Sequence, residues 1–403
     1  MQTSHGFHLT YCTNIHAADG WDAVFANVRR YAPALKARFS PAAPFGVGLR
    51  LSAREARELL EGDRLDGFRA FLDREGLYVS IINGFPYGPF HGTPVKASVY
   101  APDWRDLARV DYTLDLIRIL GKLAPDGLDG GVSTAPLSYK PWMAGQDEAA
   151  WTTITRHVVR VAEALVRLRR DTGTLIHLDI EPEPDCSLEN TSETVAFFEQ
   201  QLFPAGARML ASTIGVTEAE ARQHLQDHVR LCFDCCHFAV EYEDPAAALD
   251  RLRAAGIQIG RVQLSSALKV VFPKDRRQAE AMARQLQPFA DETYLHQVVE
   301  RRPEGLSHYA DLDQALHKPD GADGATPDEW RIHFHVPLFA REYESFGSTQ
   351  DYVREVLRLA VQSPFTRHLE IETYTWDVLP AGLKIDLLDS IAREYDWVLG
   401  AIA

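Results

Sequence analysis

The sequence predicts an α/β fold in which eight strand–helix units close into a single (β/α)8 barrel. Short apolar runs alternate with longer segments of helical periodicity along most of the chain, which indicates βαβ units and a parallel sheet. Several apolar runs end in a polar side chain, as barrel strands do where they open into the mouth. The 403 residues fit one domain, because α/β barrels commonly exceed the usual domain size.

The eight predicted strands are apolar inside because helices cover both faces of a parallel sheet. Turn signals mark some of their ends, since Asn83-Gly84 closes the third strand and Pro182 ends the fifth. The predicted strands are Leu9–His16, Phe45–Leu51, Leu77–Asn83, Gly130–Ala135, Leu175–Ile180, Val229–Asp234, Gly260–Ser266 and His368–Tyr374.

Segments between the strands have the periodicity of amphipathic helices. Ser52 is followed three residues later by Glu55, which predicts a capping box at the start of a helix. Gly173 is expected to end the longest helix. The other predicted helices are Trp21–Phe39, Val110–Leu123, Ala149–Arg170, Gln350–Val361 and Leu383–Leu399.

One segment departs from this alternation after the seventh strand. We interpret residues 267–329 as an insertion within a single domain of residues 1–403, because the strand–helix pattern returns afterwards. The insertion is expected to contain a helix and a hairpin formed by Tyr294–Arg301 and Gly305–Leu312. An extended apolar run, Trp330–Phe339, follows it.

Composition and charge exclude several classes of protein. The formal net charge of -15 repels phosphate backbones, which disfavours a nucleic-acid partner. No apolar stretch is long enough to cross a bilayer, so no membrane insertion is expected. Three of the five cysteines, Cys232, Cys235 and Cys236, lie in or beside one apolar strand, which indicates buried, reduced thiols. With no secretory signal visible at Met1–His8, we expect a cytoplasmic protein.

Polar side chains stand at the ends of four predicted strands. These are Glu181, Asp234, Gln263 and Glu372. In a barrel all strand ends point to one mouth, where three carboxylates would repel one another strongly. A divalent cation removes that repulsion, so the pattern predicts a metal site.

Other residues near these strand ends complete the predicted ligand set. Alternation along the last strand places Glu370 and Glu372 on one face, and Glu372 is preferred because it lies nearer the open end. Glu183 and Glu370 stay as alternatives. His333 and His335 also share a face, and one of them is expected to bind metal and the other substrate. The predicted metal ligands are Glu181, Asp234, His237, Gln263, His335 and Glu372.

Each of these side chains also has a structural interpretation. Asp234 could cap the following helix with His237 packed beside it, and Glu372 could pair with an arginine. Gln263 could satisfy backbone groups, and one of the two histidines could be core. The coincidence of four polar residues at strand ends favours the metal site.

Three motifs follow successive features of the predicted mouth: Ile180-Glu181-Pro182, Phe233-Asp234-Cys235-Cys236-His237 and Leu369-Glu370-Ile371-Glu372-Thr373. They resemble those of the xylose-isomerase-like TIM barrels, a group of sugar isomerases, ketose 3-epimerases, inosose dehydratases and endonuclease IV. Four further stretches are Leu9–His16, Tyr294–Gln297, His333–Pro337 and Glu372–Trp376. Through these stretches the chain resembles, more narrowly, the EboE-type metabolite-traffic proteins.

The resemblance implies a bound divalent metal, Mn²⁺, Mg²⁺ or Zn²⁺, with Glu181 and Glu372 as the catalytic bases. The relatives place a histidine on the seventh strand where this sequence has Gln263. A neutral oxygen ligand favours Mn²⁺ or Mg²⁺ over Zn²⁺, unless His335 replaces the missing imidazole.

The expected activity is isomerisation or epimerisation of a small polyol, sugar or cyclitol-like metabolite. The alternatives are a metal-dependent hydrolase of a small phosphoester and a non-catalytic barrel that binds a metabolite. The sequence does not decide the substrate, and it leaves homo-oligomerisation open. The predicted substrate-binding residues are Asn14, His16, Tyr87, His91, Lys140, His296, His333 and Trp376; the aromatic ones could equally be core, and Lys140 a solvated surface residue.

Overall fold

The computed structural model describes residues 1–88, 95–145, 148–290, 294–317, 326–343, 345–375 and 386–403. It contains the predicted barrel, in which eight strands lie in the order β1-β14-β7-β6-β5-β4-β3-β2. The paired strands are parallel, and a parallel bridge between Cys12 and Gly48 joins the two ends of the sheet. The strands are β1 (His8–Tyr11), β2 (Phe45–Arg50), β3 (Leu77–Asn83), β4 (Gly130–Thr134), β5 (Ile176–Ile180), β6 (Val229–Asp234), β7 (Ile259–Leu264) and β14 (His368–Ile371).

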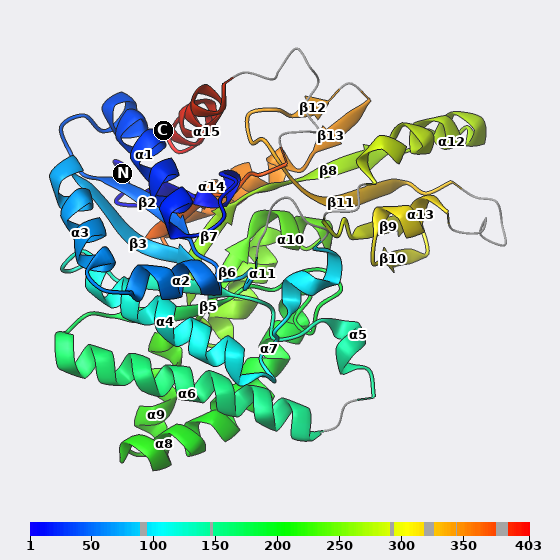
Figure 1. Cartoon of the computed structure of the whole chain (residues 1–403). Helices are drawn as coiled ribbons and strands as arrows, with labels where there is room; N and C mark the ends of the chain where they lie inside the picture. Colours follow the sequence, from blue (N-terminus) through cyan, green and yellow to red (C-terminus); the bar gives the residue numbers. More distant parts are fainter. Residues whose placement is uncertain (89–94, 146–147, 291–293, 318–325, 344, 376–385) are drawn as a thin grey trace.

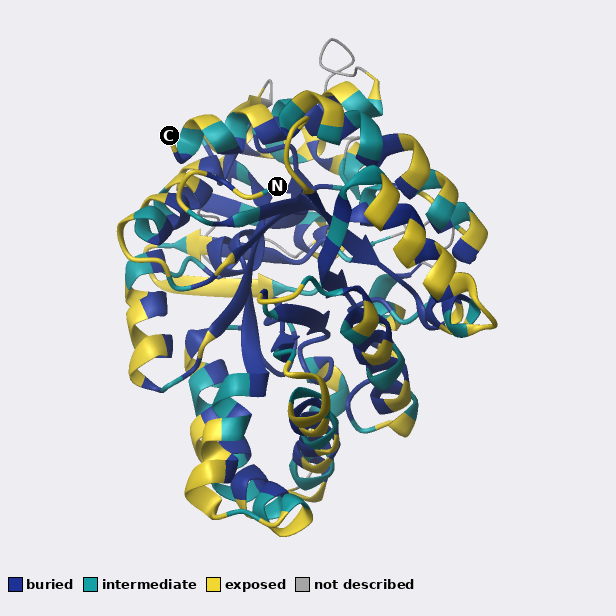
Figure 2. Cartoon of the chain, turned by 90° about the vertical axis from the view of Figure 1, so that its left-hand side faces the viewer, coloured by how far each residue is buried: buried dark blue, intermediate teal, exposed yellow. Residues whose placement is uncertain are grey.

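Helices cover the outside of the barrel (Figure 1). Their buried sides face the strands and their exposed sides face solvent, as the colours of Figure 2 show. This is the arrangement expected of amphipathic helices. The capping box predicted at Ser52 and Glu55 is present at the start of α2. The helices are α1 (Trp21–Phe39), α2 (Ala53–Leu60), α3 (Arg64–Glu75), α4 (Leu107–Leu123), α5 (Lys140–Met143), α6 (Glu148–Thr172), α7 (Thr191–Phe197), α8 (Ala207–Ile214), α9 (Glu218–His228), α10 (Cys235–Val240), α11 (Pro245–Ala254), α14 (Gln350–Gln362) and α15 (Leu387–Ala401), with a π-helical segment, Phe198–Gly206, between α7 and α8. None of the described helices is both long and apolar enough to cross a membrane.

A second, antiparallel sheet extends from one end of the barrel (Figure 1). Its six strands lie in the order β10-β9-β11-β8-β13-β12, and their buried apolar side chains form a separate small core. The predicted hairpin is present as β9 and β10. The elements are β8 (Ser266–Val271), α12 (Arg276–Gln285), β9 (Val298–Arg302), β10 (Gly305–Tyr309), α13 (Leu312–Leu316), β11 (Glu329–Val336), β12 (Glu342–Tyr343) and β13 (Phe346–Ser348).

The largest differences from the sequence analysis are two strand ends and one additional strand. The first strand ends at Tyr11 because Thr13–Ile15 turn into a 3₁₀ helix. The last strand ends at Ile371, three residues earlier than expected. The strand β8, which begins almost directly after β7, was not predicted, because its partners β11 and β13 are far away in the sequence.

Below the mouth, the barrel interior contains a fully buried arginine. Arg261 on β7 donates to Asp179 at 3.1 Å and to Glu370 at 3.2 Å, and all three side chains are 0% exposed. Its guanidinium also donates to the carbonyl oxygens of Ile82 and Gly131 at 3.1 and 2.6 Å. Glu370 therefore pairs with Arg261 one layer below the mouth. Glu372 lies closer to the mouth than Glu370.

Three glycines make room for these buried charges. A Cβ atom at Gly48 would overlap the carboxylate of Glu370, and one at Gly131 or Gly260 would overlap that of Asp179. None of the three has a positive φ. The positions therefore need glycine because of what fills the adjacent space and not because of their backbone conformation.

Candidate metal centre

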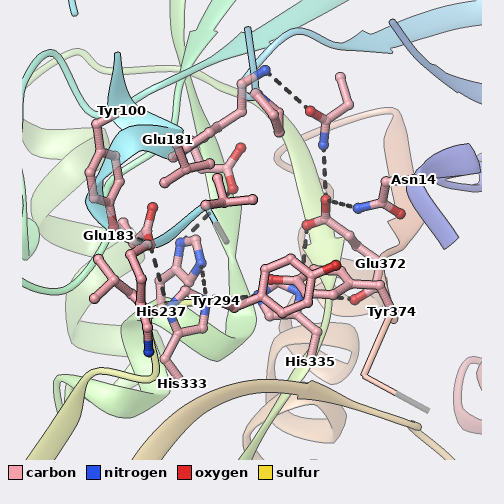
Figure 3. Close-up of a pocket in the computed structure, with 17 residues that line it drawn as sticks. Asn14, Tyr100, Glu181, Glu183, His237, Tyr294, His333, His335, Glu372 and Tyr374 are labelled. Carbon is pink, nitrogen blue, oxygen red and sulfur yellow. Dashed lines mark hydrogen bonds and ion pairs between the residues drawn. The ribbon is translucent and has the colours of Figure 1, made fainter. Parts of the chain in front are cut away.

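The predicted polar residues at the strand ends are buried at the mouth of the barrel. Glu181 follows β5, Asp234 ends β6, and Glu372 follows β14. Gln263 pairs with Asp234 in the register of β6 and β7. All four are at most 4% exposed. Glu181 and Glu372 line a cavity and stand on either side of it (Figure 3).

Two asparagines hold one oxygen of Glu372. The side-chain amides of Asn14 and Asn83 donate to Oε1 at 2.9 and 2.8 Å. The other oxygen, Oε2, lies 3.7 Å from Nδ1 of His335. Asn83 was not among the predicted site residues, although it ends β3 as the other polar residues end their strands. The two amide donors fix the direction of the Glu372 carboxylate without adding a charge.

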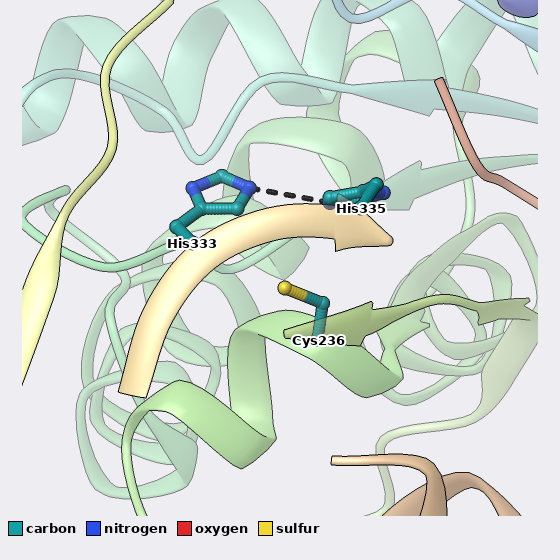
Figure 4. A group of neighbouring side chains, drawn as sticks. All are labelled: Cys236, His333 and His335. Atoms are coloured by element: carbon teal, nitrogen blue, oxygen red, sulfur yellow. Dashed lines mark hydrogen bonds between the residues drawn. The ribbon is translucent and has the colours of Figure 1, made fainter. Parts of the chain in front are cut away.

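Three imidazoles meet at the same cavity. His237 is on α10, whereas His333 and His335 come from β11 of the second sheet (Figure 3). The Nε2 atom of His333 lies 3.2 Å from Nε2 of His237 and 3.2 Å from Nε2 of His335. His333 and His335 lie on the same side of β11, and Cys236 lies on α10 across that strand (Figure 4). The second sheet thus completes a site that the barrel begins.

Asp234 both caps a helix and faces the imidazoles. Its Oδ1 accepts from the hydroxyl of Ser265 at 2.7 Å and from the backbone N–H of His237 at 3.1 Å. Nε2 of His237 lies 3.9 Å from Oδ1, and Nε2 of His335 lies 4.0 Å from Oδ2. The capping interpretation from the sequence is therefore correct for one oxygen, and Oδ2 is left for another partner.

Several buried polar atoms here have no hydrogen-bond partner within the described residues. They include Oε2 of Glu181, Oδ2 of Asp234 and Nε2 of Gln263. The amide oxygen of Gln263 accepts from the thiol of Cys232 at 3.1 Å, so a role as ligand would replace that contact. Buried carboxylate oxygens without donors are costly unless a cation satisfies them, so the residues present fit a divalent metal.

The electrostatics of the site favour the same ion. Burial raises the pKa of Glu181 well above its usual value, and the charge of Asp234 raises it further. Burial, Glu181 and Asp234 together raise the pKa of Glu372. Burial lowers the pKa of His335 to about 4, so this imidazole is neutral at pH 7 and able to bind a metal. A cation would relieve the repulsion between the carboxylates.

A hydrogen-bonded group behind His333 was not predicted. Nδ1 of His333 lies 2.7 Å from Oε1 of Gln297, and the amide of Gln297 donates to Glu183 at 3.2 Å. Tyr100 also donates to Glu183, at 2.7 Å. Glu183 could have been ranked higher from the sequence, because it follows Glu181 by two residues and so shares its side of an extended segment. Gln297 belongs to the stretch Tyr294–Gln297 that resembles the EboE type, but nothing local to Gln297 or Tyr100 indicates their contacts with Glu183.

The predicted substrate-binding residues divide into three groups. Asn14 and His333 line the cavity, and His296 stacks on Phe334 behind it. The structure places others away from the cavity lining: His16 contacts Tyr11 and Tyr31, Tyr87 packs on Tyr112, and Lys140 pairs with Glu189 and Glu193. His91 and Trp376 lie outside the described residues.

No protein-family model matches the sequence, and no curated protein matches it either. Solved structures do match the fold. A xylose isomerase-like TIM barrel protein from Mycobacterium smegmatis, solved in complex with magnesium, is 14% identical with a TM-score of 0.52, and the match covers 100% of both chains. This likeness shows that the chain has the xylose-isomerase-like TIM-barrel fold.

Two other solved structures match more loosely. The probable 3-DHS dehydratase AsbF from Bacillus anthracis is 10% identical with a TM-score of 0.47, covering 96% of this chain and 97% of that one. The IOLI protein, solved with a zinc atom, is 10% identical with a TM-score of 0.46, covering 98% of each chain.

Proposed function

We propose that the protein is a metal-dependent isomerase or epimerase of a small sugar or cyclitol-like polyol, of the EboE type. One observation supports this most directly. Glu181 and Glu372 are two buried carboxylates that face one cavity from either side, and His237 and His335 line the same cavity (Figure 3). Two carboxylates so placed can remove a proton from one face of a substrate carbon and deliver one to the other.

The side chains around the cavity would have different roles in the reaction. A bound divalent ion would polarise the substrate oxygens and so acidify the neighbouring C–H bond. Asn14 and Asn83 hold Oε1 of Glu372, which leaves Oε2 as the atom that exchanges a proton. Tyr294 and Tyr374 line the same cavity and offer ring faces to the apolar side of a sugar.

Replacing Glu372 with glutamine tests this function. An amide cannot act as a base, so we expect the rate to fall by about 10²–10⁴-fold. The measurement is deuterium uptake from D₂O into a panel of ketoses, aldoses and inososes, with Mn²⁺ or Mg²⁺ present. The control is Glu329→Gln, which changes a buried carboxylate that pairs with Arg301 and Arg331 away from the cavity. Uptake by Glu372→Gln at the unchanged rate would contradict the proposal, as would no uptake by the unaltered protein with any of these sugars.

The three imidazoles support a second candidate. Nitrogen-rich ligand sets are typical of zinc hydrolases, so hydrolysis of a small phosphoester is the alternative. Against it, the cavity is lined by Glu181, Glu183 and Glu372, whose charge repels phosphate. Release of inorganic phosphate from sugar phosphates, without deuterium uptake, would favour the hydrolase. A barrel that binds such compounds without either reaction would be a non-catalytic carrier.

A further inference from the structure

We propose that His237, His333 and His335 bind a zinc-class ion of their own, beside the ion that the carboxylates bind. The mouth would then hold two different metals. The inference rests on the proposed function only in placing an ion among the carboxylates. The imidazole position itself is argued from the contacts of the three rings.

The first step is the protonation of each ring. Nδ1 of His237 lies 2.8 Å from the carbonyl oxygen of Pro182, and Nδ1 of His335 lies 3.0 Å from that of Glu372. A carbonyl oxygen can only accept a hydrogen bond, so both Nδ1 atoms carry the proton. In the neutral rings, Nε2 therefore presents a lone pair.

The same holds for His333, although its partner is an amide. The amide nitrogen of Gln297 lies 3.1 Å from the carbonyl oxygen of Pro184, which fixes that nitrogen as a donor. The amide oxygen of Gln297 then faces Nδ1 of His333 and accepts from it. In all three rings the lone pair is thus on Nε2, and Nε2 of His333 lies 3.2 Å from that of each of the other two.

The second step concerns what lies between these Nε2 atoms. The lone pair of His333 faces those of His237 and His335 at 3.2 Å each, and such lone pairs repel one another unless a cation lies between them. A shared proton would satisfy two of the nitrogens and leave the third without a donor. A metal ion satisfies all three, and tetrahedral zinc with Zn–N bonds of about 2.0–2.1 Å requires nitrogens roughly 3.3–3.4 Å apart.

The third step separates this position from the carboxylates. Glu181 approaches His237 at its Nδ1 edge, at 3.9 Å, and Glu372 approaches His335 at its Nδ1 edge, at 3.7 Å. Asp234 approaches the Nε2 atoms of His237 and His335 instead, at 3.9 and 4.0 Å. Asp234 therefore borders the imidazole position and would neighbour both ions.

The two positions differ in the metal that they prefer. Neutral imidazoles favour zinc over manganese and magnesium, whereas carboxylate oxygens suit the harder ions. The three imidazoles all line the cavity, which leaves a fourth coordination position for water or substrate.

The experiment loads the full-length protein with Zn²⁺ and Mn²⁺ together and measures both by elemental analysis after gel filtration. We expect about one zinc and about one manganese per chain. His333→Gln should lose the zinc and keep the manganese, and Glu181→Gln should do the opposite. Cobalt substitution gives an independent signal, because the visible absorption of tetrahedral Co²⁺ should disappear in His333→Gln.

The matched control is His368→Gln. His368 is another fully buried histidine, grouped with Asp129 and His177 elsewhere in the barrel. The His368→Gln protein should keep the zinc that the three imidazoles bind. If His333→Gln unfolds, Gln297→Leu tests the site through the partner of His333 and should weaken zinc binding by about 10–100-fold.

Two outcomes would overturn the proposal: a single ion that both His333→Gln and Glu181→Gln remove, or zinc that survives His333→Gln and is lost in His368→Gln. These outcomes are separate from failure of the proposed function. Two ions bound as expected, without deuterium uptake into any polyol, would refute the isomerase and leave the imidazole site intact.

Discussion

Replacing Arg261 with methionine is expected to lower the free energy of unfolding by about 3–5 kcal/mol. The guanidinium is the partner of both Asp179 and Glu370, and none of the three side chains is exposed. Methionine fills most of the space but leaves two carboxylates buried without their cation. Urea denaturation followed by circular dichroism would measure the change.

Two further variants show whether the loss comes from the buried charges. Arg301→Met removes a half-exposed arginine that pairs with Glu329, and should cost no more than about 1 kcal/mol. Adding Glu370→Gln to Arg261→Met should recover part of the lost stability, because one of the two stranded charges is removed. If Arg261→Met lowers the free energy of unfolding by less than about 1 kcal/mol, the attraction within the ion pairs only offsets the cost of removing their charges from water.

Asp234→Asn is expected to have the largest effect on the metal. Asparagine caps a helix as well as aspartate does, so α10 and the fold should be kept. The change removes the carboxylate that lies 3.9 Å from Nε2 of His237 and 4.0 Å from Nε2 of His335, together with its negative charge. We expect metal affinity to fall by more than the roughly 10–100-fold that follows loss of a residue supporting a ligand.

Isothermal titration with Mn²⁺ and with Zn²⁺ would measure this effect. Ser265→Ala is the matched comparison, because the Ser265 hydroxyl donates to Oδ1 of Asp234 without facing the imidazoles. It should weaken binding by only about 10–100-fold. Unchanged metal content in Asp234→Asn, with the protein still folded, would remove Asp234 from the centre.

Much of the barrel could be predicted because each of its strands is marked by a pattern within a few neighbouring residues. Each strand is a short apolar run that ends at a turn or a polar residue, and parallel strands bring those ends to one mouth. That argument located Glu181, Asp234 and Glu372 without any knowledge of the pairing. Alternation along β5 likewise places His177 and Asp179 on one face, and Nδ1 of His177 lies 2.5 Å from Oδ1 of Asp179.

The second sheet could not be predicted in the same way because its pairing is non-local. Strand β8 pairs with β11 and β13, from which long stretches of chain separate it. The meeting of His333 with His237 depends on that pairing, so the sequence could place the two histidines of β11 on one face but not beside α10. Gln297, which orients His333, belongs to the stretch Tyr294–Gln297 that resembles the EboE type, but nothing in that stretch indicates its contact with His333.

The glycines that border the buried arginine have a consequence for how this chain can change over time. At Gly48, Gly131 and Gly260 even a methyl group would enter the volume of the Glu370 or Asp179 carboxylate. Such a substitution becomes tolerable once the neighbouring acid has been shortened or lost. In descendants of this sequence, the small residues and the acids opposite them are therefore expected to be exchanged as pairs.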